Sequence, residues 1–149
     1  MSISKISGET ILASFGGGYS LRGTIANDAI TPVAGTTYYG GGAAHVSGAT
    51  SAATRRLYIP KTGTIKSCYG FFNQIGSTSG NTGTLNIRLN NTTDTAVGSS
   101  QAHNTNPTIY SSTALSIAVT QGDYIEFKWT CPATIAPTVM TSSFIIYIE

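Results

Sequence analysis

Charge is scarce in this chain. Only 9% of its 149 residues are Asp, Glu, Lys or Arg, against roughly 25% in an average soluble domain. The formal net charge is +2, and the basic residues are scattered from Lys5 to Lys128. The sequence therefore lacks the basic patch that nucleic-acid binding requires. A surface rich in Ser, Thr, Gly and Asn has little charge repulsion, so we expect it to associate readily.

Long apolar runs are also missing. The first 20 residues contain no apolar stretch of signal-peptide length, and no later segment approaches the roughly 20 apolar residues of a membrane helix. We therefore expect no membrane partner, and synthesis without secretion.

Cysteine is limited to Cys68 and Cys131, and neither lies in a CxxC or His-rich context. Two buried thiols on core strands are the favoured interpretation. A disulfide between them is the alternative, which a reduced compartment would disfavour. With so few ligands, we expect no metal and no cofactor.

Catalytic signatures are absent as well. The sequence has no GxSxG elbow and no P-loop. His45 and His103 both lie in Ser/Ala/Asn/Gly-rich stretches, which predicts solvated loop histidines. Asp123 and Glu126 are the only acids suited to a glycosidase pair, which needs two carboxylates about 5–9.5 Å apart. Nothing else supports that pair, so we expect no enzyme.

Alternation of apolar and polar residues is what the sequence does contain. It is clearest in residues 113–131, where a Gly122-Asp123 break predicts a sharp turn between two strands. The apolar positions of these strands are Leu115, Ile117 and Val119, then Ile125, Phe127, Trp129 and Cys131. Period two places each set on one face of a strand.

Similar patterns predict strands over 55–59, 64–74, 84–90, 107–110 and 139–149, and no stretch shows a helical period. This favours an all-β fold, an antiparallel β-sandwich of jelly-roll type, over residues 46–149. Both faces of the 64–74 strand are apolar, with Ile65, Tyr69 and Phe71 on one and Phe72 on the other. We therefore expect this strand to be central or to contact another subunit.

Residues 1–45 differ from the rest, since short apolar bursts alternate with runs of glycine. Glycine runs weaken strands and helices through backbone entropy, which predicts an extended N-terminal arm with about two short strands. Such an arm needs a partner to cover its large apolar side chains. The partner-binding candidates are Ile11, Leu12, Phe15, Tyr19, Leu21, Tyr38 and Tyr39.

The segment from Arg55 to Trp129 resembles the jelly-roll modules of tailed-bacteriophage virion proteins, which are similar to the trimeric TNF/C1q-like sandwich. The resemblance covers residues 55–149. It rests on three motifs: Ile59-Pro60 with Gly63 and Ile65, then Leu85-x-Ile87-Arg88-x-Asn90, then Val119 with Gly122-Asp123 and Ile125.

The resemblance implies a homotrimer, whose interface we expect at Tyr69, Phe71 and Tyr124. It also implies a structural virion protein made in the host cytoplasm. A chain with an adhesive, glycine-rich arm and no long stalk suits a decoration (cement) protein on the outer surface of a phage head. In that role we expect the arm to dock on the major capsid protein. The alternative is a tail-fibre or head-fibre tip that binds a host glycan through loop aromatics such as Tyr110.

Overall fold

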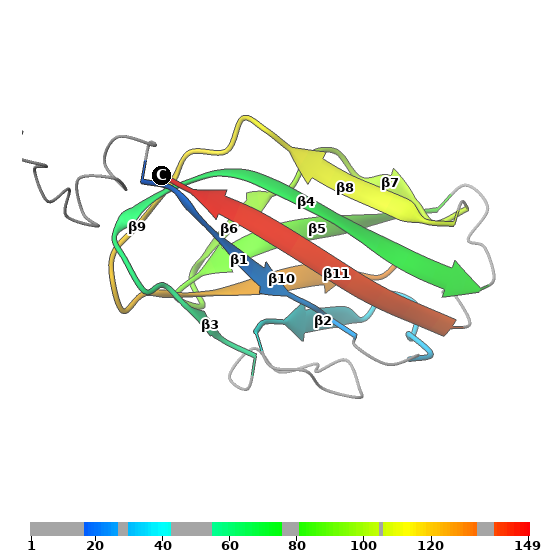
Figure 1. Cartoon of the computed structure of the whole chain (residues 1–149). Coiled ribbons are helices and arrows are strands. Elements are labelled where there is room, and N and C mark those ends of the chain that lie inside the picture. The colour runs from blue at the N-terminus through cyan, green and yellow to red at the C-terminus, as the bar shows by residue number, and fades with distance from the viewer. Residues whose placement is uncertain (1–16, 27–29, 43–54, 76–80, 105, 134–138) are drawn as a thin grey trace, which may run out of the picture.

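The computed structural model describes residues 17–26, 30–42, 55–75, 81–104, 106–133 and 139–149, and every regular element among them is a β-strand. The strands form two sheets that pack face to face around one hydrophobic core (Figure 1). Every strand pairing is antiparallel. The predicted antiparallel β-sandwich is therefore confirmed.

The first sheet, called the β4 sheet below, has the strand order β1-β11-β4-β8. Its members are β1 (Tyr19–Gly23), β11 (Val139–Ile148), β4 (Gly63–Ile75) and β8 (Thr108–Ser112). The short strand β9 (Ile117–Val119) pairs with the beginning of β4. Strands β1 and β8 are thus at opposite edges of this sheet.

The second sheet, called the β10 sheet, has the strand order β2-β10-β5-β6. Its members are β2 (Thr37–Gly40), β10 (Tyr124–Thr130), β5 (Thr82–Leu89) and β6 (Thr93–Ala96). Two short strands complete it, β3 (Leu57–Tyr58) beside β10 and β7 (Gln101–Ala102) beside β5.

Part of the segment expected to form the N-terminal arm belongs to the sandwich. Strand β1 pairs with β11 over its whole length, and β2 pairs with β10. Between them, Ile25 and Ala26 are buried in the core. Apolar burial against the two sheets orders residues 19–26 and 30–40, so among the described residues the arm and the sandwich are one unit. Residues 1–16, 27–29 and 43–45 of the expected arm lie outside the described residues.

A β-bulge changes which side chains of β4 face the core. The pairing with β11 shifts by one residue between Ile65 and Ser67, and such a bulge moves the alternation by one position. The prediction that Ile65 shares a face with Tyr69 and Phe71 is therefore wrong. Ile65 and Phe72 are fully buried, whereas Tyr69 is exposed.

Aromatic rings fill the centre of the core around Phe72. The Phe72 ring centroid lies 4.9 Å from that of Trp129, 5.3 Å from that of Phe144 and 5.8 Å from that of Tyr110. Gly70 permits the approach of Phe144, because a Cβ at this position would overlap the Phe144 ring. These contacts join three strands of the β4 sheet to β10 on the opposite sheet.

The predicted turn at Gly122-Asp123 is confirmed. Gly122 has a φ of 93°, which favours glycine. The Asp123 carboxylate accepts hydrogen bonds from Asn90 Nδ2 at 2.9 Å and from the Thr120 backbone N–H at 2.7 Å. These bonds, the Asn90 bond most strongly, lower the pKa of Asp123. The side chain therefore holds the turn together.

Candidate functional site

A polar network lies buried between the sheets, and His103 is at its centre. His103 has no solvent exposure. Its Nδ1 lies 2.7 Å from Gln74 Oε1, and its Nε2 lies 2.9 Å from the Tyr110 hydroxyl and accepts from Trp129 Nε1 at 3.2 Å. The prediction of a solvated loop histidine is wrong for His103, because the local composition does not reveal that this loop folds over the core. His45 lies outside the described residues.

The partners of His103 fix its protonation. The Trp129 indole can only donate, so Nε2 is the acceptor, and the ring proton is on Nδ1 and points to Gln74. Gln74 in turn donates through Nε2 to Thr108 Oγ1 at 3.1 Å. Burial lowers the pKa of His103 to about 4. The imidazole is thus neutral near pH 7, with both nitrogens engaged by buried side chains.

Tyr110 is also part of this network. Its side chain has no exposure, and burial raises its pKa. The expectation that Tyr110 is an exposed loop aromatic for glycan binding is wrong, because Tyr110 occupies an inward position of β8 between outward-facing Ile109 and Ser111.

Both cysteines are free and buried. Burial raises the pKa of Cys68 to about 12 and that of Cys131 to about 11. A thiol that stays protonated is a weak nucleophile and a weak metal ligand. The interpretation as two buried thiols therefore agrees with the structure, and no disulfide joins them.

The two acids considered as a glycosidase pair have separate environments. Both Asp123 oxygens serve the turn. Glu126 occupies an outward position of β10 but is fully buried, and neither of its carboxylate oxygens has a hydrogen-bond partner among the described residues. Burial raises the pKa of Glu126, and the nearby guanidinium groups of Arg88 and Arg56 oppose this effect. Glycosidase chemistry requires two carboxylates that reach a substrate, and this carboxylate is closed to solvent.

Charged side chains gather on the outer face of the β10 sheet and largely neutralise one another. Asp94 accepts from Lys128 Nζ and lies 3.6 Å from Arg88 Nε. Arg88 also donates to the Tyr39 hydroxyl at 3.1 Å. At the other end of this face, the Arg56 guanidinium lies 4.2 Å from the centroid of the Tyr124 ring, a cation–π distance.

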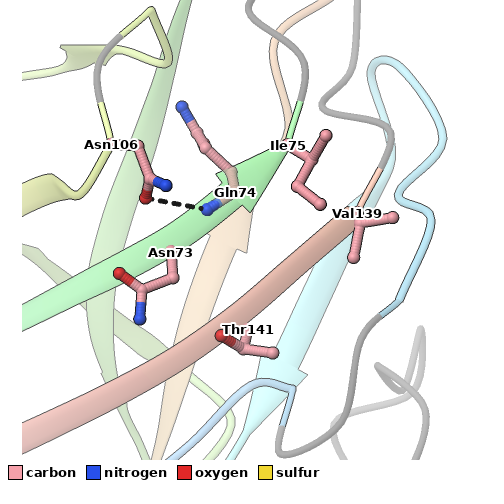
Figure 2. A pocket seen from close by; sticks show the side chains of 6 residues that line it. All are labelled: Asn73, Gln74, Ile75, Asn106, Val139 and Thr141. Atoms are coloured by element: carbon pink, nitrogen blue, oxygen red, sulfur yellow. Dashed lines mark hydrogen bonds between the residues drawn. The ribbon is translucent and has the colours of Figure 1, made fainter.

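A small pocket opens where β4 ends and β11 begins, shown in Figure 2. It is lined by Asn73, Gln74, Ile75, Asn106, Val139 and Thr141. Asn106 Oδ1 accepts from the Gln74 backbone N–H at 3.2 Å, which fixes one wall. The lining contains amides, a hydroxyl and aliphatic side chains but no titratable group. Its volume of about 200 Å³ is below the roughly 300–1,000 Å³ of common ligand sites.

The outer face of the β4 sheet carries several large apolar side chains among small polar ones. Tyr69 is 51% exposed, Ile75 67% and Ile109 43%. Phe71, Ile145 and Tyr147 project from the same face and are partly exposed. In β1, β4, β8 and β11 the only charged side chains are Arg22 and Lys66. Exposed apolar faces of this kind mark interaction surfaces.

One hollow interrupts this face beside the β1 edge. It has a volume of about 190 Å³ and is lined by Arg22, Tyr69, Phe71, Ser143, Phe144 and Ile145. The Arg22 side chain is exposed, and no hydrogen bond or ion pair links it to the part of the chain that the structure describes. Sequence reasoning missed both Arg22 and Ile109. The signal for Ile109 was its alternation with Thr108 and Tyr110, which both face the core.

The sequence-predicted interface residues separate onto opposite faces. Tyr69 and Phe71 lie on the outer face of the β4 sheet, whereas Tyr124 lies on the outer face of the β10 sheet. The structure does not bring these three side chains together.

The candidates for partner binding in the N-terminal segment also lie in different parts of the structure. Ile11, Leu12 and Phe15 lie outside the described residues. Tyr19 and Leu21 pack partly buried against the core, and the Tyr19 hydroxyl donates to the Lys61 carbonyl. Tyr38 is buried in the core, where its hydroxyl accepts from the Val33 N–H at 2.8 Å. Tyr39 contacts Arg88 on the outer face of the β10 sheet.

Within the described ranges, no group of three or more His, Cys, Asp or Glu side chains is arranged to hold a metal ion. The same ranges contain no helix of the length and apolarity needed to cross a bilayer. Comparison with protein-family models, with curated proteins and with solved structures finds no match for this chain.

Proposed function

We propose that the chain is a structural subunit of a phage virion, a homotrimeric decoration protein bound to the outer surface of the capsid. The observation that carries the proposal is the exposed, nearly uncharged apolar face of the β4 sheet, because burial of such a surface favours association. The side-chain networks of the interior are closed and engaged, which suits a protein whose work is binding at its surface.

The sandwich topology supports the same proposal. Several connections cross between the two sheets, as from β1 to β2, from β3 to β4 and from β10 to β11, whereas β5, β6 and β7 follow one another within the β10 sheet. Connections between the sheets are common to β-sandwiches, the jelly roll included, so this topology is compatible with the fold type of the virion modules that the sequence resembles.

Capsid binding can be tested with capsids that lack this protein. Purified protein is added, the particles are sedimented, and the bound copies are counted by quantitative mass spectrometry. We expect saturation at a fixed ratio to the major capsid protein, with strong retention, because many modest contacts on a lattice reinforce one another. Failure to bind intact capsids, or only a few copies per native virion, would contradict decoration.

A test of the N-terminal segment in capsid binding requires a deletion shorter than the whole expected arm. Removal of residues 2–42 would delete β1 and β2, each of which pairs with a central strand. Deletion of residues 2–16 leaves all described strands intact. We expect this variant to fold and to form trimers but to lose capsid binding. Normal decoration by this variant would exclude the segment as the docking element.

A fibre-tip adhesin is the second candidate. Tyr58 is 58% exposed and its ring packs edge-on against Tyr124 at 5.9 Å, and exposed tyrosines can stack on sugars. The adhesin alternative predicts binding to host cells, and loss of that binding in a Tyr58→Ser variant. Val33→Ser is the control, because Val33 is 63% exposed outside both sheets.

A further inference from the structure

The hollow and a protruding side chain lie at the same level on opposite edges of the β4 sheet. Ser143 of β11 pairs with Phe71 of β4, and Phe71 pairs with Ile109 of β8. These three residues therefore form one row across the sheet. Ser143 lines the hollow near the β1 edge, and Ile109 ends the row at the β8 edge.

A ring of copies would bring these two features together. Rotation about a threefold axis that runs alongside the strands keeps every atom at its own height. The β8 edge of one copy then meets the β1 edge of the next, and Ile109 arrives at the level of the hollow. A contact of this kind is head-to-tail, and it closes when the rotation divides the circle.

We propose that Ile109 of each copy inserts into the hollow beside Arg22 of the next copy, closing a ring of three. This inference rests on the proposed homotrimer and names its contact residues. The four-carbon side chain of isoleucine fits a hollow of about 190 Å³. Arg22 lies at the rim, where its aliphatic stem covers the inserted side chain and its guanidinium remains in water.

The area of the face is sufficient for such a ring. The four strands have 33 residues, and at about 3.3 Å per residue and 4.8 Å between strands they cover roughly 500 Å². Removing one copy from a ring breaks two contacts, and exposes up to about 500 Å² on that copy and a similar area on its neighbours. The sum of about 1,000 Å² meets the minimum of about 1,000 Å² expected of a biological interface.

The electrostatics favour a second copy over a charged partner. Arg22 and Lys66 are the only charges in the four strands, so an acidic or basic partner would have few groups to pair with. Ile109 brings no charge into the hollow, and the guanidinium of Arg22 stays in water at its rim.

The test introduces a charge and then compensates it. Ile109→Lys places an ammonium group beside Arg22 of the next copy, and like charges at a contact oppose association. We expect wild-type protein to have the mass of three chains by light scattering, and Ile109→Lys to have that of one. The concentration needed for assembly should rise on the order of tenfold or more.

Compensation follows from Arg22→Glu. This single variant should still assemble, and the double variant Ile109→Lys/Arg22→Glu should regain the trimer through a new ion pair between copies. Val33→Lys is the matched control, because Val33 is 63% exposed outside both sheets. It should remain trimeric.

The outcomes separate this inference from the proposed function. An Ile109→Lys protein that assembles like wild type, or a double variant that stays monomeric, overturns the contact while the homotrimer stands. A wild-type chain that is monomeric at all concentrations overturns the homotrimer itself. If Ile109→Lys does not fold by circular dichroism, Ser143→Leu decides the matter, since it fills the hollow from within and should also prevent assembly.

Discussion

The buried imidazole of His103 makes the fold sensitive to mild acid. In the unfolded chain a histidine has a pKa of about 6.5, whereas burial lowers the pKa of His103 to about 4 in the folded state. The unfolded state therefore binds more protons below pH 6.5, and the stability of the fold falls as the pH falls. The contribution of the neutral His103 imidazole to the free energy of unfolding is complete above pH 6.5 and is lost between pH 6.5 and 4.

The size of the effect follows from the two pKa values. At about 1.4 kcal/mol per pH unit, the full loss is about 3 kcal/mol, and at pH 5 it is about 2 kcal/mol. Protonation of Nε2 would also remove the acceptor for Trp129 and Tyr110. With a urea m-value of about 2 kcal/mol/M, the unfolding midpoint should fall by about 1 M between pH 7 and pH 5.

The assay compares wild-type protein with His103→Gln in urea at pH 7, 6 and 5. The variant should be less stable at pH 7, because it loses ring contacts with Phe72 and Trp129. Its stability should depend less on pH, so that the difference in free energy of unfolding between wild type and variant narrows by about 2 kcal/mol at pH 5. Other acid-sensitive groups such as Asp123 are common to both proteins and cancel. A gap that stays constant from pH 7 to pH 5 would refute this account.

Three further predictions concern other buried positions. Glu126→Gln should stabilise the fold by about 1 kcal/mol at pH 8. The gain should shrink at pH 4, because a buried carboxyl with a raised pKa destabilises the fold only when it is ionised, and urea unfolding at the two pH values measures this. Gly70→Ala should destabilise the fold by about 3 kcal/mol, since its Cβ would overlap the Phe144 ring; thermal unfolding against wild type is the check, and an unchanged midpoint would show that the ring can move aside. At pH 8 neither cysteine should react with a thiol reagent in the native protein, because both are buried. Both should react in guanidinium chloride, because both are free thiols. Reaction in the native state would contradict this burial.

The strands with strict alternation could be predicted from the sequence because one face of each is covered. Leu85 and Ile87 on β5 face the core beside Phe127 and Trp129 on β10, and the two strands pair in register. Burial on one side and solvent on the other produces a period of two, so the residue pattern and the fold carry the same information there.

The glycine-rich segment shows where such reasoning stops. Glycine runs predicted a loose arm, because glycine weakens regular structure. A Cβ at Gly40 would overlap the backbone of Thr24, and one at Gly41 would overlap the backbone of Arg55. These glycines allow chain segments distant in sequence to approach closely. That requirement arises only from tertiary contacts, so composition alone could not distinguish it from flexibility.

Long-range pairing also decides which surface is available for association. Alternation put Tyr69 and Phe71 on one face of their strand and Tyr124 opposite Ile125 on another, but it does not tell which sheet a strand joins. The pairing puts Tyr124 on a face with Arg56, Arg88, Asp94 and Lys128, most of whose charges are neutralised within the chain. Tyr69 and Phe71 lie on the other outer face, where the four strands carry only two charges and three large apolar side chains remain exposed. Desolvating a charged face costs more than desolvating an apolar one, so association through the β4 sheet, as proposed, costs less than association through the β10 sheet.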